Sequence, residues 1–206
     1  MKYKGGKVTV TATVTNTGDK AGKDVVEVYY NPPYTDGGIE KASKNLAGFE
    51  KTKELQPGES QKVTVKFDDD DMASYDYKGA KAYVLEKGDY DISIQSDSHH
   101  VIDHKAITVK DTVTYDSDSN THNGDKTVAT NQFDDVAGDV TYLSRADHFA
   151  NYKEATAAPT NFKMSDKAKE TFYNNSNYDP KKFDKDSDKM PTTGAKNGLK
   201  LSDMYG

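Results

Sequence analysis

The fold is decided by the stretch Val8–Pro33, which reads VTVTATVTNTGDKAGKDVVEVYYNPP. Over Val8–Thr15 apolar side chains alternate with threonine, and this period of two predicts a strand with one buried face. Asn16–Asp19 then interrupts the alternation with turn-forming residues. Val25–Tyr30 is rich in β-branched and aromatic residues, and the Pro-Pro pair after it ends the strand because proline has no N–H for a sheet hydrogen bond. The stretch therefore predicts two β-strands joined by a turn.

Short apolar runs of the same kind continue as far as Val109. We expect strands at 46–52, 63–67, 82–85, 88–94 and 101–109, a Pro57-Gly58 turn, and a helical turn after the acidic run Asp68–Asp71. Leu46 and Phe49 are the expected core anchors of the third strand, and Gly48 is a candidate bulge. About seven short strands with no long helix between them predict an all-β, immunoglobulin-like or fibronectin type III-like antiparallel sandwich. Because the chain lacks cysteine and tryptophan, the fibronectin type III-like variant fits better.

Composition divides the chain of 206 residues into two parts. Hydrophobic residues make up 33% of it, below the roughly 45–50% of an ordinary globular domain. Val, Ile and Leu become sparse after Val109, so the second part has little with which to build a core of its own. We therefore predict a sandwich domain over residues 1–110 and a largely irregular linker or connector over residues 111–206.

Charge and hydropathy exclude several partners. The net charge is −6 and Arg145 is the only arginine, which argues against a nucleic-acid partner. No apolar run is long enough to cross a bilayer, and no stretch near Met1 resembles a signal peptide, so we expect no membrane partner. Without cysteine, disulfides and thiolate metal sites are excluded. The sequence gives no indication of a cellular location.

Several segments of the first part together carry a family resemblance. They are Val14–Asp19, Ala21–Gly22, Val25–Tyr29, Pro32–Pro33, Lys44–Phe49, Leu55–Ser60 and Gly88–Tyr90. Over about Lys4–Val109 the chain resembles the fibronectin type III-like domain of family 3 glycoside hydrolases, which are mostly β-glucosidases. The resemblance implies a non-catalytic structural domain that braces the catalytic domains of a parent enzyme. Such a parent hydrolyses terminal β-glucosides by a retaining mechanism.

The second part carries weaker local patterns. Asp111–Asp125 has the composition of a linker, whereas Phe133–Arg145 concentrates apolar residues and is a candidate docking segment. Ser165 is a candidate cap for a short helix that runs through Phe172 and Tyr173, and Asn174–Gly206 is expected to be irregular and mobile.

The second part also extends the resemblance. Tyr142–Arg145 and Gly198–Met204 resemble the connection to the (β/α)8 barrel in the subgroup with inverted domain order. In that subgroup an α/β sandwich domain precedes the fibronectin type III-like domain and the barrel follows it. The resemblance implies that the chain is a middle piece, that its partners are these two domains of the same polypeptide, and that it meets an oligosaccharide substrate only through the parent enzyme.

No residue of the chain is predicted to be catalytic. The family's mechanism implies an Asp nucleophile in the barrel and an acid/base Glu from another domain. No stretch here matches the nucleophile motif, and Asp147 is interpreted as a surface or docking carboxylate. We therefore assign no catalytic residue, no cofactor and no cofactor-binding residue, and we leave open whether the chain alone is an enzyme.

Four acidic or histidine-rich clusters raise the question of a metal site. His99, His100 and His104 lie near Asp97 and Asp103, and the even spacing of His100 and His104 places them on one face of a strand. A zinc site needs three or four converging ligands, and a solvated loop tip explains these histidines more simply. The runs 116–120 and 184–188 begin like calcium loops but lack the Gly and Glu that such loops need at positions six and twelve. Asp68–Asp71 is better explained by helix capping than by a bound cation.

The tyrosines suggest an alternative function. A row of aromatic rings could stack on sugar rings, as in carbohydrate-binding modules. However, Tyr29 and Tyr30 are adjacent and must face opposite sides of their strand, and Tyr75, Tyr77 and Tyr83 are expected to pack at the edge of the core. The alternative to a structural domain is thus an independent carbohydrate-binding or adhesin module.

Overall fold

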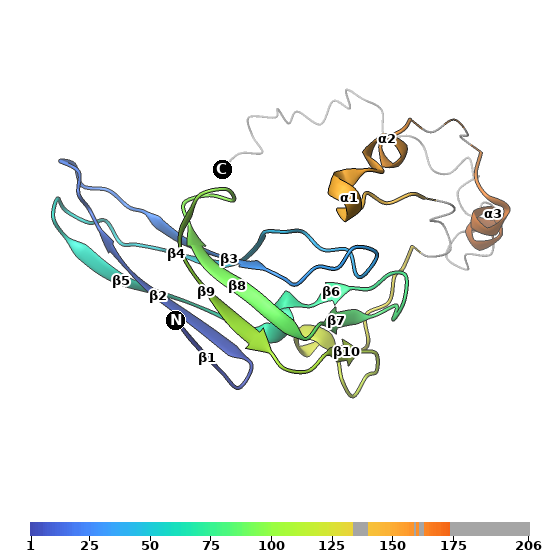
Figure 1. The fold of residues 1–206 in the computed structure, drawn as a ribbon, viewed down its shortest axis with the longest axis horizontal. Coiled ribbons are helices and arrows are strands. Elements are labelled where there is room, and N and C mark those ends of the chain that lie inside the picture. Colours follow the sequence, from blue (N-terminus) through green and yellow to red (C-terminus); the bar gives the residue numbers. More distant parts are fainter. Residues whose placement is uncertain (134–139, 159, 161–162, 174–206) are drawn as a thin grey trace, which may run out of the picture. The chain divides into compact units, whose positions relative to one another are not determined.

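A computed structural model of the chain describes residues 1–133, 140–158, 160 and 163–173 (Figure 1). It forms two units, the larger of which comprises residues 1–134 and 139–159. In the larger unit, one sheet has the order β1-β2-β5, with bounds Lys2–Lys4, Lys7–Thr15 and Ser60–Asp68. A second sheet has the order β4-β3-β8-β9, with bounds Asn45–Lys51, Val25–Asn31, Gly88–Gln95 and Val101–Val109. All pairs are antiparallel, which confirms the predicted sandwich.

The period of two in the sequence determines which side chains reach the core. In the β2–β5 pair, Val8 lies opposite Phe67 and Val10 opposite Val65, and all four side chains are buried. The threonines between them stay on the outer face, where Thr11 and Thr64 form a hydrogen bond of 3.0 Å. Burying a side chain such as valine stabilises a fold by about 1.5–3 kcal/mol. The alternation therefore holds this sheet against its neighbour.

The second sheet supplies the other half of the core. Val26, Val28 and Tyr30 of β3 are buried, and β8 adds Tyr90 and Ile92, which are 1% and 2% exposed. As predicted, Tyr29 lies on the opposite face from Tyr30. Side chains of both sheets belong to a single hydrophobic cluster. The first part of the chain thus has the core that its composition predicted.

Strand β4 differs from the prediction in its sidedness. Leu46 and Phe49, expected as core anchors, are 49% and 64% exposed. The β3–β4 register shifts between Val28 and Tyr29, so that Gly48 lies opposite Val28 while Leu46 lies opposite the outward-facing Tyr29. The shift leaves Ala47 without a partner in β3, so a bulge lies there, next to the Gly48 suggested by the sequence. Phe49 lies opposite Glu27, and the extra residue brings Leu46 to the same outer face, so the anchor prediction is wrong.

A third, small sheet extends the sandwich beyond residue 110. It has the order β10-β7-β6, with bounds Val113–Tyr115, Tyr83–Leu85 and Ser74–Tyr75. The stretch with linker composition thus contains a strand, and Tyr115 is part of the core. Farther along, the 3-10 helix η2 (His122–Gly124) places His122 in a stack on Tyr83, with ring centroids 4.0 Å apart. Composition alone misses this because two of the residues that bind the segment, Tyr83 and Asp70, lie in the sandwich.

The helices are short. The 3-10 helix η1 (Asp69–Met72) follows β5, but it lies within the acidic run and not after it as expected, because Ser74–Tyr75 form β6; Met72 is 1% exposed. The larger unit also contains α1 (Ala146–Phe149) and α2 (Tyr152–Ala155). In the other unit, α3 spans Asp166–Tyr173, and the Ser165 hydroxyl accepts a hydrogen bond of 3.1 Å from the Ala168 N–H, which confirms the predicted cap. None of the helices in these ranges is long and apolar enough to span a membrane. The expectation for Asn174–Gly206 lies outside the described residues.

Candidate functional site: the connector clasp

The candidate site lies where the chain after the sandwich returns to it. Two segments about a hundred residues apart meet there: Tyr34, Glu40 and Lys41 from the loop between β3 and β4, and Ser144 and Arg145 at the start of α1. We call these five residues the connector clasp.

Glu40 is the acceptor at the centre of the clasp. Its carboxylate accepts a hydrogen bond of 2.5 Å from the Ser144 hydroxyl and one of 3.2 Å from the Arg145 backbone N–H. The Tyr34 hydroxyl donates a third, at 3.3 Å. Partial burial alone would raise the pKa of Glu40, but these donors outweigh it and lower the pKa below its ordinary value. The carboxylate therefore stays ionised at neutral pH and holds the connector by charge-assisted hydrogen bonds.

Arg145, the only arginine of the chain, makes two further contacts. Its guanidinium lies 4.2 Å from the centroid of the Tyr34 ring, and its Nη1 donates a hydrogen bond of 3.0 Å to the Lys41 carbonyl. A planar guanidinium can stack on a ring and donate in its own plane at the same time. Arg145 thus joins the side chain of one loop residue to the backbone of another.

Lys41 fixes the loop to the sandwich. Its side chain is only 3% exposed, and its ammonium forms an ion pair with Glu86 and donates a hydrogen bond of 2.7 Å to the Pro33 carbonyl. Glu86 follows β7, and its carbonyl accepts a hydrogen bond of 3.0 Å from the hydroxyl of the buried Tyr90. A buried ammonium needs such partners to offset its loss of hydration. The clasp is therefore continuous with the core.

The connector has its own local fold around Asn151. The side chain of Asn151 accepts a hydrogen bond of 3.0 Å from the Ser144 N–H and donates one of 2.9 Å to the Tyr142 carbonyl. Between them the chain makes a tight turn in which Asp147, His148 and Phe149 all have positive φ, at 49°, 56° and 62°. Non-glycine residues rarely adopt this region. Asp147, which the sequence suggested as a surface or docking carboxylate, is an exposed residue of this turn.

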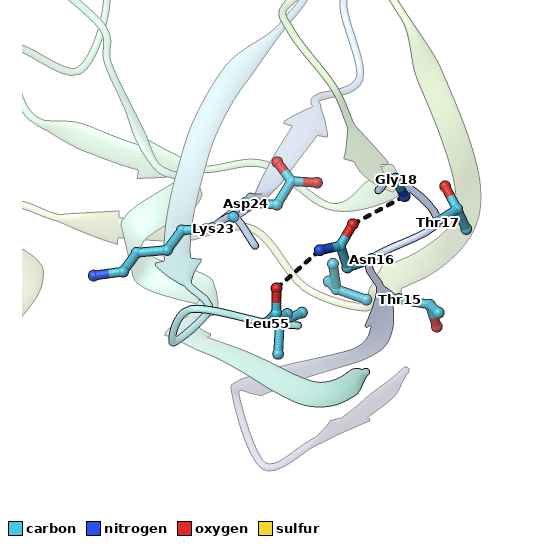
Figure 2. Close-up of a pocket in the computed structure, with 9 residues that line it drawn as sticks. Thr15, Asn16, Thr17, Gly18, Lys23, Asp24 and Leu55 are labelled. Carbon is cyan, nitrogen blue, oxygen red and sulfur yellow. Dashed lines mark hydrogen bonds between the residues drawn. The ribbon is translucent and has the colours of Figure 1, made fainter. Parts of the chain in front are cut away.

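A cavity of about 270 Å³ lies at the loop after β2 (Figure 2). As Figure 2 shows, the Asn16 side chain lies between Gly18 and Leu55. Its Nδ2 donates hydrogen bonds of 2.8 Å to the Leu55 and Lys20 carbonyls, and its Oδ1 accepts one of 3.0 Å from the Gly18 N–H. Every hydrogen-bonding atom of the amide is thus used to tie the loop to its neighbour, so we assign Asn16 a structural role.

The histidines near the β8–β9 turn form two separate pairs. The His100 ring contacts Asp97 at 2.7 Å, and the His104 ring contacts Asp91 at 2.9 Å. Hydrogen bonds from the His99 backbone N–H and then the His100 ring lower the pKa of Asp97. No group of three or more His, Asp or Glu side chains is arranged to hold a metal ion within the described residues. His99, His100 and His104 are therefore not brought together.

Two of the three acidic runs lie within the described residues, and both have structural contacts there. Asp71 accepts a hydrogen bond of 3.0 Å from the Asp68 N–H, which is half of a capping box. Asp118 accepts one of 2.8 Å from the Val128 N–H and so closes a loop. The run 184–188 lies outside the described residues.

Sequence reasoning missed the clasp itself. No local pattern marks Glu40 or Lys41 as different from other charged residues of the chain. Their partners lie far away in the sequence. One available indication was the docking segment predicted over Phe133–Arg145, whose last two residues contact the sandwich of the same chain.

Comparisons with known proteins agree with the fold. Residues 24–98 match the family model described as "Fibronectin type III-like domain". Over 86 residues the chain is 48% identical to Beta-glucosidase A of Butyrivibrio fibrisolvens, a match that covers 40% of this chain and 10% of that protein. Over 109 residues it is 42% identical to a β-glucosidase of Ruminococcus albus, covering 51% and 11%. The matches thus span about a tenth of the length of these relatives.

Solved structures give the same result. β-Glucosidase 3B from Thermotoga neapolitana, in complex with α-D-glucose, superposes with a TM-score of 0.51 at 30% identity, covering 56% of this chain and 15% of that one. A Kluyveromyces marxianus β-glucosidase, in complex with glucose, has a TM-score of 0.50 at 29% identity, covering 55% and 14%. In each case the similarity accounts for about one seventh of the larger protein.

Proposed function

We propose, since the chain contains a fibronectin type III-like domain similar to that of family 3 β-glucosidases, that it is a non-catalytic brace in an enzyme of this kind. The proposal gives residues 1–110, together with β10 that pairs with β7, the role of a rigid sandwich, and the rest of residues 111–206 the role of a connector. Its packing partners are a (β/α)8 barrel and an α/β domain of the same polypeptide, as the resemblance implies.

The connector clasp is the observation that carries this proposal. A flexible linker would leave the sandwich and the segment after it free to move separately. Here Glu40 receives three donors, and Arg145 contacts two loop residues. Each hydrogen bond to a charged group contributes about 1.5–3 kcal/mol to stability. The clasp therefore supports a fixed exit direction for the chain.

A fixed exit direction has a consequence for catalysis. In a retaining glycosidase the nucleophile and the acid/base carboxylate must face each other across one sugar. When these groups come from different domains, the domains must be held accurately, because a misplacement of about 1 Å costs about a hundred-fold in rate. A domain that never touches substrate can thus be required for turnover.

The non-catalytic assignment is tested with an aryl β-glucoside. We expect no saturable release of 4-nitrophenol from 4-nitrophenyl β-D-glucoside by the chain of 206 residues. Glu40→Gln serves as a control variant because Glu40 supplies the carboxylate of the clasp and accepts three hydrogen bonds there. Saturable turnover that the Glu40→Gln change abolishes would refute the assignment, and saturable turnover that survives it would place catalysis at another residue of the chain.

The bracing role is tested in a polypeptide that carries the two flanking domains. Arg145→Ala should lower kcat there, by up to about a hundred-fold if the active site opens by about 1 Å. The pH profile of the reaction should keep its shape, because no ionising group of the reaction has been removed. Unchanged kcat in a variant whose connector has demonstrably detached would contradict the brace.

A further inference from the structure

A groove of about 490 Å³ lies where the β1–β2 hairpin, the end of β9 and the small sheet come together. Small-molecule sites typically occupy about 300–1,000 Å³. The connector clasp and the Asn16 loop contribute no residue to this groove. Its lining combines apolar side chains of the core edge with polar groups from four elements.

Two polar side chains in the groove have hydrogen-bonding capacity left over. Asp69 accepts a hydrogen bond of 2.7 Å from the Tyr3 hydroxyl through Oδ2, while its Oδ1 has no donor among the described residues. Tyr115 is 8% exposed, and its hydroxyl makes no hydrogen bond to another residue in the described part of the chain. Burial, with Asp70 and Asp69 nearby, raises the pKa of Tyr115 to about 12, so this hydroxyl keeps its proton at neutral pH.

Two glycines in the turn between β1 and β2 keep the groove open beside Asp69. Gly5 and Gly6 have φ values of +58° and +77°, which L side chains rarely adopt. A Cβ atom on Gly6 would lie 3.1 Å from Asp69 Oδ1. Glycine therefore leaves uncovered the carboxylate oxygen that has no donor.

The charges that line the groove cancel. Lys4 and Lys110 contribute two ammonium groups, and Asp69 and Asp111 contribute two carboxylates. An anion would meet the carboxylates and a cation would meet the ammonium groups, so neither gains much net attraction. A neutral ligand with several hydroxyls can instead donate to Asp69 and exchange hydrogen bonds with Tyr115 and the lysines.

Apolar side chains complete the groove. Tyr3 and Val113 are partly exposed there, while Leu85 and Val109, at 3% and 5% exposed, lie beneath them in the core. Sugar rings have a C–H face that packs on aliphatic and aromatic side chains while their hydroxyls form hydrogen bonds. The groove offers both kinds of contact within one cavity.

We propose that this groove binds a neutral polyhydroxylated ligand of pyranose size, with Asp69 and Tyr115 as its hydrogen-bonding partners. The proposal is independent of the bracing function, since a brace can carry a sugar site without taking part in catalysis. The proposed groove would give this chain its own contact with a sugar, whereas the family resemblance implies contact with substrate only through the parent enzyme.

The test is an NMR titration of the chain of 206 residues with methyl β-D-glucopyranoside. The backbone amide signals of Gly5, Gly6, Lys110 and Asp111 should shift together and saturate with one dissociation constant. For a small neutral ligand on an open site we expect this constant to be on the order of 1–10 mM. The absence of saturable shifts up to about ten times that concentration would overturn the proposal.

Matched variants localise the binding. Tyr115→Phe removes one hydroxyl and keeps the ring, and should raise the dissociation constant about five-fold. Tyr142→Phe, on the connector, is the control and should leave it unchanged. Asp69→Asn is a second groove variant and should also raise the dissociation constant. The dispersion of its NMR spectrum shows that the variant is folded. Equal affinity in the wild type and in both groove variants would refute the assignment of the site to Asp69 and Tyr115. Saturable shifts of the same amides with calcium chloride or sodium phosphate alone would refute the proposal that the ligand is neutral.

Discussion

At the scale of single residues, the connector depends on the side chain of Arg145. Its ring stacking and its hydrogen bond to the Lys41 carbonyl both need a planar guanidinium. We expect Arg145→Lys to lower the free energy of local opening by about 1 kcal/mol, because lysine keeps the charge and loses the stack. Amide hydrogen exchange should then be about five-fold faster at Ser144 and Arg145. Lys153→Arg is the matched control, and equal protection in Arg145→Lys and wild type would contradict this role.

Acid should also open the clasp, through Glu40. Hydrogen bonds in the folded state lower the pKa of Glu40 below its ordinary value of 4.5. A group whose pKa is lower when folded stabilises the fold fully above its unfolded pKa, and this stabilisation is lost as pH falls through the folded pKa. The stabilisation of the clasp by ionised Glu40 should thus be constant from neutral pH down to about pH 5. It should be lost as the pH falls below the ordinary pKa of Glu40.

The chemical shift of the Arg145 amide is the measurement for the acid effect. It should stay constant near neutral pH and titrate only below the ordinary pKa of a glutamate, because its N–H donates to the carboxylate. Glu40→Gln should abolish this titration. A midpoint above the ordinary value would show that burial outweighs the donors.

At the scale of elements, the bulge in β4 depends on Gly48. A Cβ atom at this position would lie 3.0 Å from Val65 Cγ1 in the opposite sheet, and Val65 is 5% exposed. Gly48→Val should therefore overpack the core and lower the free energy of unfolding by about 1–3 kcal/mol. Urea denaturation measures this, with Gly22→Ala as control because a Cβ there would have no neighbour within 4 Å. Equal midpoints for both variants would show that β4 shifts to make room.

Prediction from sequence succeeded for elements whose pattern is local. Strands β2 and β5 have a strict period of two, and the Pro57-Gly58 turn needs only its own residues: Glu59 donates back to the Gln56 carbonyl at 2.9 Å, and Gly58 has φ +78°. The Ser165 cap is equally local. Leu46 and Phe49 were placed on the wrong face because the strand carries apolar residues on its outer face as well, and a bulge at Ala47 changes the face of Leu46 without changing the composition of the strand.

The candidate site could not be predicted in the same way. Glu40 is one acidic residue among many, and its three donors come from Tyr34, six residues away, and from Ser144 and Arg145, more than a hundred residues away. His122 reads as a linker residue until Tyr83 and the Asp70 carbonyl, 3.0 Å from its ring, are known. Long-range pairing of this kind leaves no periodicity in the sequence.

At the scale of the whole molecule, the sandwich extends past residue 110. β10 pairs with β7, and Tyr115 belongs to the core. A chain ending at residue 110 should therefore be less stable by about 2–4 kcal/mol than one ending at residue 133, because it leaves Leu85 and neighbouring apolar surface uncovered. Thermal or urea unfolding of the two truncated chains measures the difference. Equal stability would place the domain boundary at residue 110, as composition predicts.

The single arginine gives the connector a built-in reporter. A protease specific for arginine has one target bond in the chain, that between Arg145 and Ala146. This bond lies inside the clasp, where the Arg145 N–H and Nη1 both donate to the sandwich. Cleavage therefore requires the connector to detach first. The rate at which the two cleavage products appear on a gel then measures how often the connector detaches, without any label or engineered probe.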